Sequence, residues 1–227
     1  GGKLIEGQTV VYDEYPVLGA HITGNVFGGG KLANVGKYDL DNDRVDVTGN
    51  TYVNIGVKND AAVPEGESKV TIAGNVYGGG EGSDLTFKCE NAMVTGSTSV
   101  VIGNGTVGTL DANDKLVAGT STVYGGGKIA RVEENTEVTI GIGDGVDETT
   151  YTPTSTPVIR GNVFGAGAGV STHGYSALTR GISTVTVKGN AKVKGNVYGG
   201  GELASVGRYK VPTTEEQVQE AIAAGYN

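Results

Sequence analysis

The stretch Gly195-Asn-Val-Tyr-Gly-Gly-Gly201 decides the fold of this 227-residue chain, because near copies of it recur along the sequence. The four other copies begin at Gly24, Gly74, Ser121 and Gly161, and each keeps the Val, an aromatic residue after it and at least two of the three glycines. Repetition of this kind indicates a chain built from equivalent units that stack on one another.

A second string, Ser/Thr-x-Val-x-Ile/Val, lies between successive copies of the first and has the alternation of a half-buried strand. It occupies residues 51–55, 98–102, 136–140 and 183–187. Alternation predicts that Val53, Ile55 and their equivalents point inward, while residues such as Tyr52, Glu137 and Thr139 point outward. A third strand piece is expected after the glycines, at residues 32–35, 129–132 and 203–206.

The composition agrees with a chain made of strands. Glycine contributes 41 residues, and 31 Val against only 9 Leu give an apolar content that favours strands over helices. The glycines do not fall at every third position, which excludes collagen. A net charge of −8 opposes binding to nucleic acid, and because no run of 18 apolar residues exists we expect no membrane insertion of this segment.

These repeats predict an all-β fold, a right-handed parallel β-helix (β-solenoid) of about five coils with loop insertions. Residues 183–207 represent the undecorated coil, and the other coils lengthen it by insertions after either strand piece. Equivalent residues of successive coils then lie above one another and form continuous stripes. The stripe of the first string consists of Val26, Val76, Val123, Val163 and Val197.

The first glycine of each copy is expected at a sharp corner, where only glycine avoids crowding the next coil or adopts a positive φ. These corner glycines are Gly28, Gly78, Gly125, Gly165 and Gly199. The Asn before the repeated Val is expected to form a hydrogen-bonded ladder between coils. We interpret the aromatic residue after the Val as packing beneath the insertions, in preference to a binding platform.

Residues 212–227 break the pattern, so the β-solenoid is assigned to residues 1–211 and a helical segment to the remainder. Thr213 and Glu216 have the spacing of a capping box, Gly225 ends the helix, and Val218 and Ile222 give it a narrow apolar stripe. Two interpretations stay open: the helix caps the last coil, or it begins a further insertion.

Three acidic residues, Asp39, Asp41 and Asp43, begin like a calcium-binding loop. Arg44 and Asn50 stand where an EF-hand needs its Gly and its Glu. A solvated acidic loop is therefore favoured over a Ca²⁺ site, and we predict no cofactor.

We predict no catalytic residue either. Residues 79–84 match the start of a calcium-binding nonapeptide, but that mechanism needs tandem copies. His21 and His173 lie far apart in the chain, and Cys89 has neither a neighbouring His nor a second Cys. The predicted outward positions hold no pair of carboxylates, so a polysaccharide lyase or glycoside hydrolase of the β-helix type is the alternative rather than the main hypothesis.

The strings Val-Tyr-Gly-Gly-Gly and Thr-x-Val-x-Ile, over roughly residues 9–207, resemble the glycine-rich right-handed β-helix repeats of adhesin-like proteins that anaerobic gut bacteria secrete or attach to their surface. The resemblance implies an extracellular or cell-surface location, associated with the outer membrane. It also implies a longer chain, as does the start Gly-Gly-Lys without Met. The expected function is structural and adhesive, not enzymatic: the coils present variable loops that bind a host or microbial glycan or a surface protein.

Overall fold

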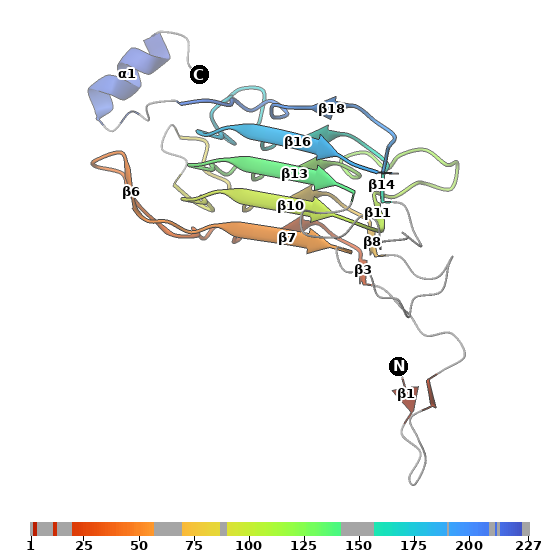
Figure 1. The fold of residues 1–227 in the computed structure, drawn as a ribbon. Coiled ribbons are helices and arrows are strands. Elements are labelled where there is room, and N and C mark those ends of the chain that lie inside the picture. The colour runs from red at the N-terminus through yellow and green to blue at the C-terminus, as the bar shows by residue number, and fades with distance from the viewer. Residues whose placement is uncertain are drawn as a thin grey trace.

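Parallel β-sheets account for most of the secondary structure in the computed structural model, and a short helix, α1 (Glu215–Ala223), lies near the C-terminus (Figure 1). The residues described are 2–3, 11–12, 20–56, 70–86, 90–141, 157–189, 191–208, 212 and 214–223. The fold is mostly β, as the excess of Val over Leu predicts.

Three sheets of the described chain are purely parallel, and each collects equivalent strands of successive repeats. The long-strand sheet contains β7 (Thr51–Ile55), β10 (Thr98–Ile102), β13 (Thr136–Ile140) and β16 (Ser183–Val187). The glycine-motif sheet contains β4 (Val26–Phe27), β9 (Val76–Tyr77), β12 (Val123–Tyr124), β15 (Val163–Phe164) and β18 (Val197–Tyr198). The short-strand sheet contains β3 (His21–Ile22), β8 (Thr71–Ile72), β11 (Thr106–Val107), β14 (Val158–Ile159) and β17 (Lys192–Val193).

Successive strands of the chain thus enter different sheets, and each pairs with its equivalent in the next repeat. We define a repeat unit as one strand from each sheet, so unit 1 holds β3, β4 and β7, and the following strands form units 2 to 4 in the same way. Unit 5 holds β17 and β18. Figure 1 shows β7, β10, β13 and β16 lying above one another in this order.

The pairing between units is in register. In the glycine-motif sheet, Val26 pairs with Val76, Val76 with Val123, Val123 with Val163, and Val163 with Val197. These five residues therefore form the continuous stripe that the repeated string predicts.

The prediction of a third strand after the glycines is wrong. Those residues form only isolated bridges between units, such as Val35 with Val94 and Val94 with Val132. The remaining strand of each unit comes instead from the residues just before the glycine string, for example Thr71–Ile72. A strand of two residues is too short for alternation to reveal it in a sequence.

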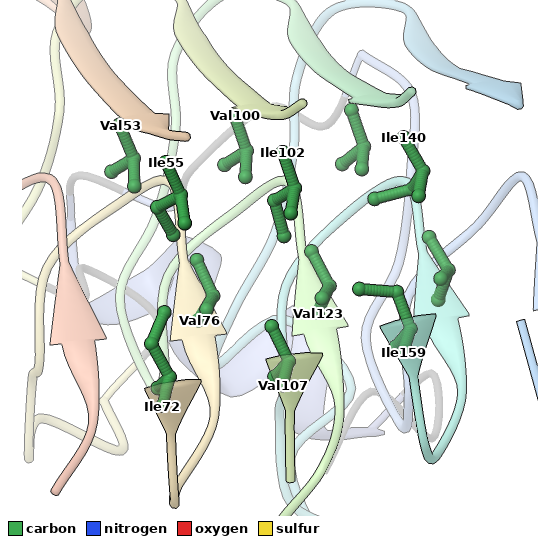
Figure 2. Packing of buried hydrophobic residues seen from close by; sticks show 12 residues of the cluster. Val53, Ile55, Ile72, Val76, Val100, Ile102, Val107, Val123, Ile140 and Ile159 are labelled. Atoms are coloured by element: carbon green, nitrogen blue, oxygen red, sulfur yellow. The ribbon is translucent and has the colours of Figure 1, made fainter. Parts of the chain in front are cut away.

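The core contains the inward Val and Ile side chains of all three sheets (Figure 2). Val100, Ile102 and Ile140 of the long-strand sheet are completely buried, and Ile159 of the short-strand sheet and Val123 of the glycine-motif sheet are buried with them. Complete burial of a side chain of this size contributes about 1.5 to 3 kcal/mol. The core is therefore a stack of equivalent Val and Ile residues, one set from each unit.

Burial departs from the predicted alternation at two places. Thr139 was expected to face outward on β13 but is buried, whereas its strand neighbour Glu137 is exposed as predicted. Val187, an expected inward residue, is exposed because β16 is the last strand of its sheet.

Gly78 shows why a glycine is needed at the corner. A Cβ atom on Gly78 would lie 2.1 Å from the carbonyl oxygen of Gly125 in the next unit, a distance that no real side chain tolerates. The positive φ angles of this corner belong instead to Leu32 (55°), Ile129 (49°) and Leu203 (51°), which follow the third glycine by two residues. Close approach between units, and not a left-handed backbone, therefore explains the corner glycines.

Antiparallel pairs lie outside the three parallel sheets. β1 (Gly2–Lys3) pairs with β2 (Val11–Tyr12), and β5 (Lys37–Asp39) pairs with β6 (Arg44–Val47). The β5–β6 hairpin forms part of the first insertion, a segment that the sequence indicates only as an acidic loop.

The α1 helix begins after Thr214, whose Oγ1 atom accepts a hydrogen bond of 3.3 Å from the backbone N–H of Gln217. Thr214 therefore caps the helix, and Thr213 and Gly225, which were expected to begin and end it, lie outside the described residues. None of the described residues of α1 is buried. Val218 and Ile222 face a pocket of about 590 Å³ that is lined on its other side by Leu85 and Tyr175. No helix in the described part of the chain is both long and apolar enough to cross a membrane.

Candidate functional site

The aromatic residues of the glycine string form a column of stacked rings, one from each unit. Neighbouring ring centroids lie 4.7 to 5.3 Å apart, and neighbouring ring planes are tilted by at most 11°. The column contains Phe27, Tyr77, Tyr124, Phe164 and Tyr198. The three middle rings are buried, and each covers the faces of its neighbours. Sugar rings therefore cannot stack on them, and only the edges of these rings are available to a ligand.

Two tyrosine hydroxyl groups lie along one edge of this column. The hydroxyl of Tyr77 accepts a hydrogen bond of 3.3 Å from Asn75 Nδ2, and the same Nδ2 atom donates to the carbonyl oxygen of Gly119 at 2.8 Å. The hydroxyl of Tyr124 donates a short hydrogen bond to Glu202 Oε2. Burial raises the pKa of Tyr77 to about 12, and burial together with the hydrogen bond to the Glu202 carboxylate raises the pKa of Tyr124 further. Both hydroxyl groups therefore stay protonated at neutral pH.

A pocket of about 310 Å³ opens over these hydroxyl groups. Tyr77 of unit 2 and Tyr124 of unit 3 line it, together with Thr120 and Lys128 of unit 3 and Glu202 of unit 5. Its volume lies at the small end of the range for small-molecule sites. Hydroxyl, ammonium and carboxylate groups converge in it, so the pocket can both donate and accept hydrogen bonds.

Lys128 of unit 3 forms an ion pair with unit 2. Its Nζ atom lies 2.9 Å from Glu81 Oε1, and the Nζ atom of Lys31 lies 3.5 Å from Glu81 Oε2. The hydrogen bond from Lys128 lowers the pKa of Glu81. Residues 31, 81, 128, 168 and 202 are bridged in series, so these charges follow one column across the units.

A second polar cluster lies partly buried between the β5–β6 hairpin and units 3 and 4. The Nη1 atom of Arg180 donates to the hydroxyl of Tyr38 at 2.8 Å, to Asp43 Oδ1 at 3.0 Å and to Glu133 Oε2 at 2.9 Å. Glu133 also forms a close ion pair with Arg131, whose side chain is 1% exposed. The guanidinium group of Arg131 lies 4.9 Å from the centre of the Tyr38 ring.

Charge in this second cluster is balanced, because two guanidinium groups meet two carboxylates. Burial opposes ionisation of Arg180, but the charge of Glu133 and the hydrogen bond with Asp43 hold its pKa above the usual value. Burial, followed by the hydrogen bond to Asp43, raises the pKa of Tyr38. The cluster therefore attaches the hairpin to the parallel sheets. The repeat pattern in the sequence gives no signal for Arg131, Glu133 or Arg180.

The candidate metal residues Asp39, Asp41 and Asp43 belong to this hairpin and serve separate purposes. Asp39 Oδ1 accepts hydrogen bonds from the backbone N–H groups of Asp41 at 3.1 Å and Asn42 at 3.2 Å, which closes the turn. Asp43 is directed at Arg180. Within the described ranges, no group of three or more His, Cys, Asp or Glu residues is placed to hold a metal ion.

The two histidines lie in different units, and each has a threonine partner. His21 Nδ1 lies 2.7 Å from Thr71 Oγ1, and His173 Nδ1 lies 2.7 Å from Thr172 Oγ1. Cys89 lies outside the described residues. In the 79–84 segment, Asp84 accepts backbone hydrogen bonds from Thr86 at 2.8 Å and Glu90 at 2.7 Å, so its carboxylate orders a loop.

Comparison with models of protein families, with curated proteins and with solved structures finds no match to this chain. A function therefore has to be argued from the chemistry of the chain's own residues, and the pocket beside the aromatic column is the candidate site.

Proposed function

We propose that the three parallel sheets wind as a right-handed parallel β-helix of about five coils, which forms a structural and adhesive segment of a bacterial surface or secreted protein. The in-register pairing of equivalent residues in all three sheets supports this architecture. Right-handed connection between parallel strands is the strong general preference, which supports the handedness. The segment belongs to a longer extracellular or outer-membrane-associated chain.

The observation that carries the adhesive role is the contrast between constant strands and variable insertions. The strands keep one register across the units, while the segment between β12 and β13 is short and the segment between β15 and β16 is longer. A rigid scaffold that carries loops of different length is a common basis for binding surfaces. The partly buried cluster around Arg180 supports the same role, because it holds the β5–β6 hairpin in a fixed position.

The ligand that fits the pocket best is a glycan. Thr120, Lys128 and Glu202 offer donors and acceptors suited to sugar hydroxyl groups, and the tyrosine hydroxyls add a polar floor. Since the ring faces are covered by one another, recognition depends on hydrogen bonds rather than on stacking. A peptide loop of a surface protein with the same polar groups is the other ligand of this proposal.

A glycan array probed with the whole chain tests this function. We expect Lys128→Met to abolish binding to the glycans that the unaltered chain retains, because it removes an ammonium donor from the pocket. Lys192→Met removes the same charge from an exposed position on β17 and is the matched control. Equal binding by the unaltered chain and Lys128→Met, or equal loss in both variants, would contradict the pocket as the binding site.

The same preparations test the alternative of a polysaccharide lyase or glycoside hydrolase. We expect no shortening of acidic polysaccharide chains on incubation with the protein. Depolymerisation that disappears in the Glu202→Gln variant would replace the adhesive proposal with an enzymatic one, because Glu202 is the carboxylate of the pocket.

A further inference from the structure

Two insertions and the α1 helix enclose the pocket of about 590 Å³, which shares no lining residue with the pocket beside the aromatic column. We call it the insertion pocket, because one wall follows β9 in unit 2 and another follows β15 in unit 4. The segment of unit 3 between β12 and β13 is shorter than both, so the two insertions meet across it. There the hydroxyl of Tyr175 in the unit 4 insertion donates a hydrogen bond of 3.1 Å to the carbonyl oxygen of Leu85 in the unit 2 insertion.

The wall from unit 2 is held in shape by its own side chains. Asn91 Oδ1 accepts hydrogen bonds from the backbone N–H groups of Ser83 at 2.9 Å and Asp84 at 3.3 Å. The carboxylate of Asp84 accepts one from Thr86 at 2.8 Å and one from Glu90 at 2.7 Å. Burial opposes ionisation of Asp84, but these two backbone hydrogen bonds hold its pKa below the usual value. Asp84 therefore stays charged at neutral pH while it orders the loop.

The wall from unit 4 is also fixed by hydrogen bonds. The backbone N–H of Val170 donates to Ser176 Oγ at 3.1 Å, which closes the loop that carries Tyr175. The N–H of Ser205, a residue that follows β18, donates to the carbonyl oxygen of Gly174 at 2.8 Å. Both loop walls are therefore formed before a ligand arrives, and a ligand that binds a preformed site has less ordering entropy to overcome.

The α1 helix supplies the third wall with one of its faces. Glu215, Val218 and Ile222 all line the insertion pocket. They are spaced by three and four residues, which places them on the same side of a helix. Pro212, two residues before the capping Thr214, is buried and anchors the chain where it enters the helix. The helix thus turns both apolar and negatively charged side chains toward the two insertions.

The insertion pocket combines apolar surface with charge of a single sign. Leu85 and Ile222 are 39% and 43% exposed, so both leave apolar surface that a ligand can cover. The charged side chains among the described lining residues are all carboxylates, namely Asp84, Glu90 and Glu215. Complementary charge and apolar contact are what a ligand of such a site has to supply. The ligand is therefore an organic cation with an apolar part.

The placement of the three carboxylates narrows the class of cation. Asp84 and Glu90 belong to the unit 2 insertion, whereas Glu215 belongs to α1. Among the residues that the structure describes, no three acidic, His or Cys side chains converge closely enough to hold one metal ion. The carboxylates are therefore spread around the pocket, which suits a ligand whose positive charges are separated by hydrocarbon. Linear aliphatic polyamines have this pattern, since short methylene segments join their ammonium groups.

We propose that the insertion pocket binds a linear aliphatic polyamine, whose ammonium groups pair with Asp84, Glu90 and Glu215 while its methylene segments cover the apolar lining. The aromatic ring of Tyr175 adds a group that attracts ammonium ions. The site is built from insertions and not from the repeated strands, so it is a property of this chain rather than of the repeat. It does not depend on the glycan ligand of the other pocket, and either proposal can fail alone.

Isothermal titration calorimetry of the whole 227-residue chain with spermidine tests the proposal. We expect saturable binding that weakens as NaCl is added, because salt screens the ion pairs. Glu215→Gln should lower the affinity by about threefold or more, whereas Glu216→Gln makes the same change one residue along α1, outside the pocket, and should not lower it. Ile222→Asn should also weaken binding by about threefold or more, and Ala223→Asn, at an exposed position outside the pocket, is its control.

Three further probes separate the parts of the proposed ligand. Hexanediol offers a methylene chain without charge, MgCl₂ offers charge without a chain, and a lysine tripeptide offers the same charges on a peptide. We expect each to bind more weakly than spermidine by about tenfold or more. Thermal unfolding of every variant checks that it is folded. Absence of saturable spermidine binding overturns the proposal. So do equal affinities of Glu215→Gln and Glu216→Gln, and so does any of the three probes that binds as tightly as spermidine.

Discussion

Arg180 Nη1 lies 3.0 Å from Asp43 Oδ1, although the two residues are 137 positions apart in the sequence. This contact joins the β5–β6 hairpin of the first insertion to the residues just before β16. Glu133, between β12 and β13, forms an ion pair with the same guanidinium group of Arg180. The hairpin is therefore attached to units far beyond the one from which it emerges.

Replacing Arg180 should destabilise the protein strongly. In Arg180→Met the carboxylates of Asp43 and Glu133 lose their shared partner in a partly buried site. Removal of one member of a fully buried ion pair costs about 3 to 5 kcal/mol, and partial exposure reduces the expected loss to about 2 to 3 kcal/mol. Chemical denaturation measures the loss. Arg44→Met is the control, because its guanidinium group is largely exposed and its ion pairs lie at the surface. Equal stability of the two variants would show that the cluster around Arg180 does not hold the hairpin.

Shortening a core side chain should have a large effect that its exposed strand neighbour does not share. Ile140 is completely buried on β13, so Ile140→Ala is expected to lower the free energy of unfolding by about 2 to 5 kcal/mol. Glu137→Ala alters an exposed position of the same strand and should change it by less than about 0.5 kcal/mol. Urea denaturation distinguishes these outcomes, and similar losses would place the core on the wrong face of β13.

An interior corner glycine and the terminal one should respond differently to the same substitution. Gly78→Ala forces a Cβ atom against the carbonyl oxygen of Gly125, so we expect a loss of about 1 to 3 kcal/mol or failure to fold. Gly199→Ala meets no described atom and should leave the unfolding midpoint of the dilute, monomeric chain unchanged. Thermal unfolding at low concentration compares the two. A destabilised Gly199→Ala would mean that unit 5 is covered within the chain itself.

Alkaline pH should unfold the protein through the aromatic column. Burial raises the pKa of Tyr77 to about 12, whereas the pKa of an unfolded Tyr is near 10. The unfolded chain therefore releases this proton first, so the contribution of neutral Tyr77 is complete below pH about 10 and is lost as the pH rises through about 12. The urea midpoint of the unaltered protein should fall between pH about 10 and about 12. The midpoint of Tyr77→Phe should fall less over the same interval. Tyr52→Phe, at an exposed ring, should follow the unaltered protein.

Acid should weaken the column of charges. The hydrogen bond from Lys128 lowers the pKa of Glu81 below that of a free Glu. The unfolded chain then binds this proton more readily, so the contribution of ionised Glu81 is complete above the unfolded pKa and is lost as the pH falls below about 4. Glu81→Gln should show a smaller loss of stability between pH 5 and pH 3. An unchanged acid transition in Glu81→Gln would mean that the carboxylate gains nothing from Lys128.

Part of this structure could be predicted because the repeat places like residues at like positions. The Val stripe from Val26 to Val197 and the inward alternation of Val53 and Ile55 follow from strings that can be compared by eye. The strand that precedes each glycine string could not be predicted, because a pair such as Thr71–Ile72 offers no period to recognise. The positive φ of Ile129 was also unexpected, since β-branched residues rarely adopt it.

The candidate site, too, could be predicted only in part. The aromatic column was visible in the sequence, and its preferred interpretation was packing rather than a binding platform. Its pocket was not visible, because only the stacking of units brings Glu202 of unit 5 close to Thr120 and Lys128 of unit 3. The cluster of Arg131, Glu133 and Arg180 was hidden for the same reason.

The sequence by itself determined which residues repeat, and hence that parallel strands pair in register, because a periodic pattern of Val and Ile can bury its apolar face only against its own copies. Tertiary structure decided where the insertions attach, which carboxylate meets Arg180, and which glycines face neighbouring backbone and which face open space. Those contacts join residues outside any period, and their partners are fixed only by the paths that the loops take across the sheets.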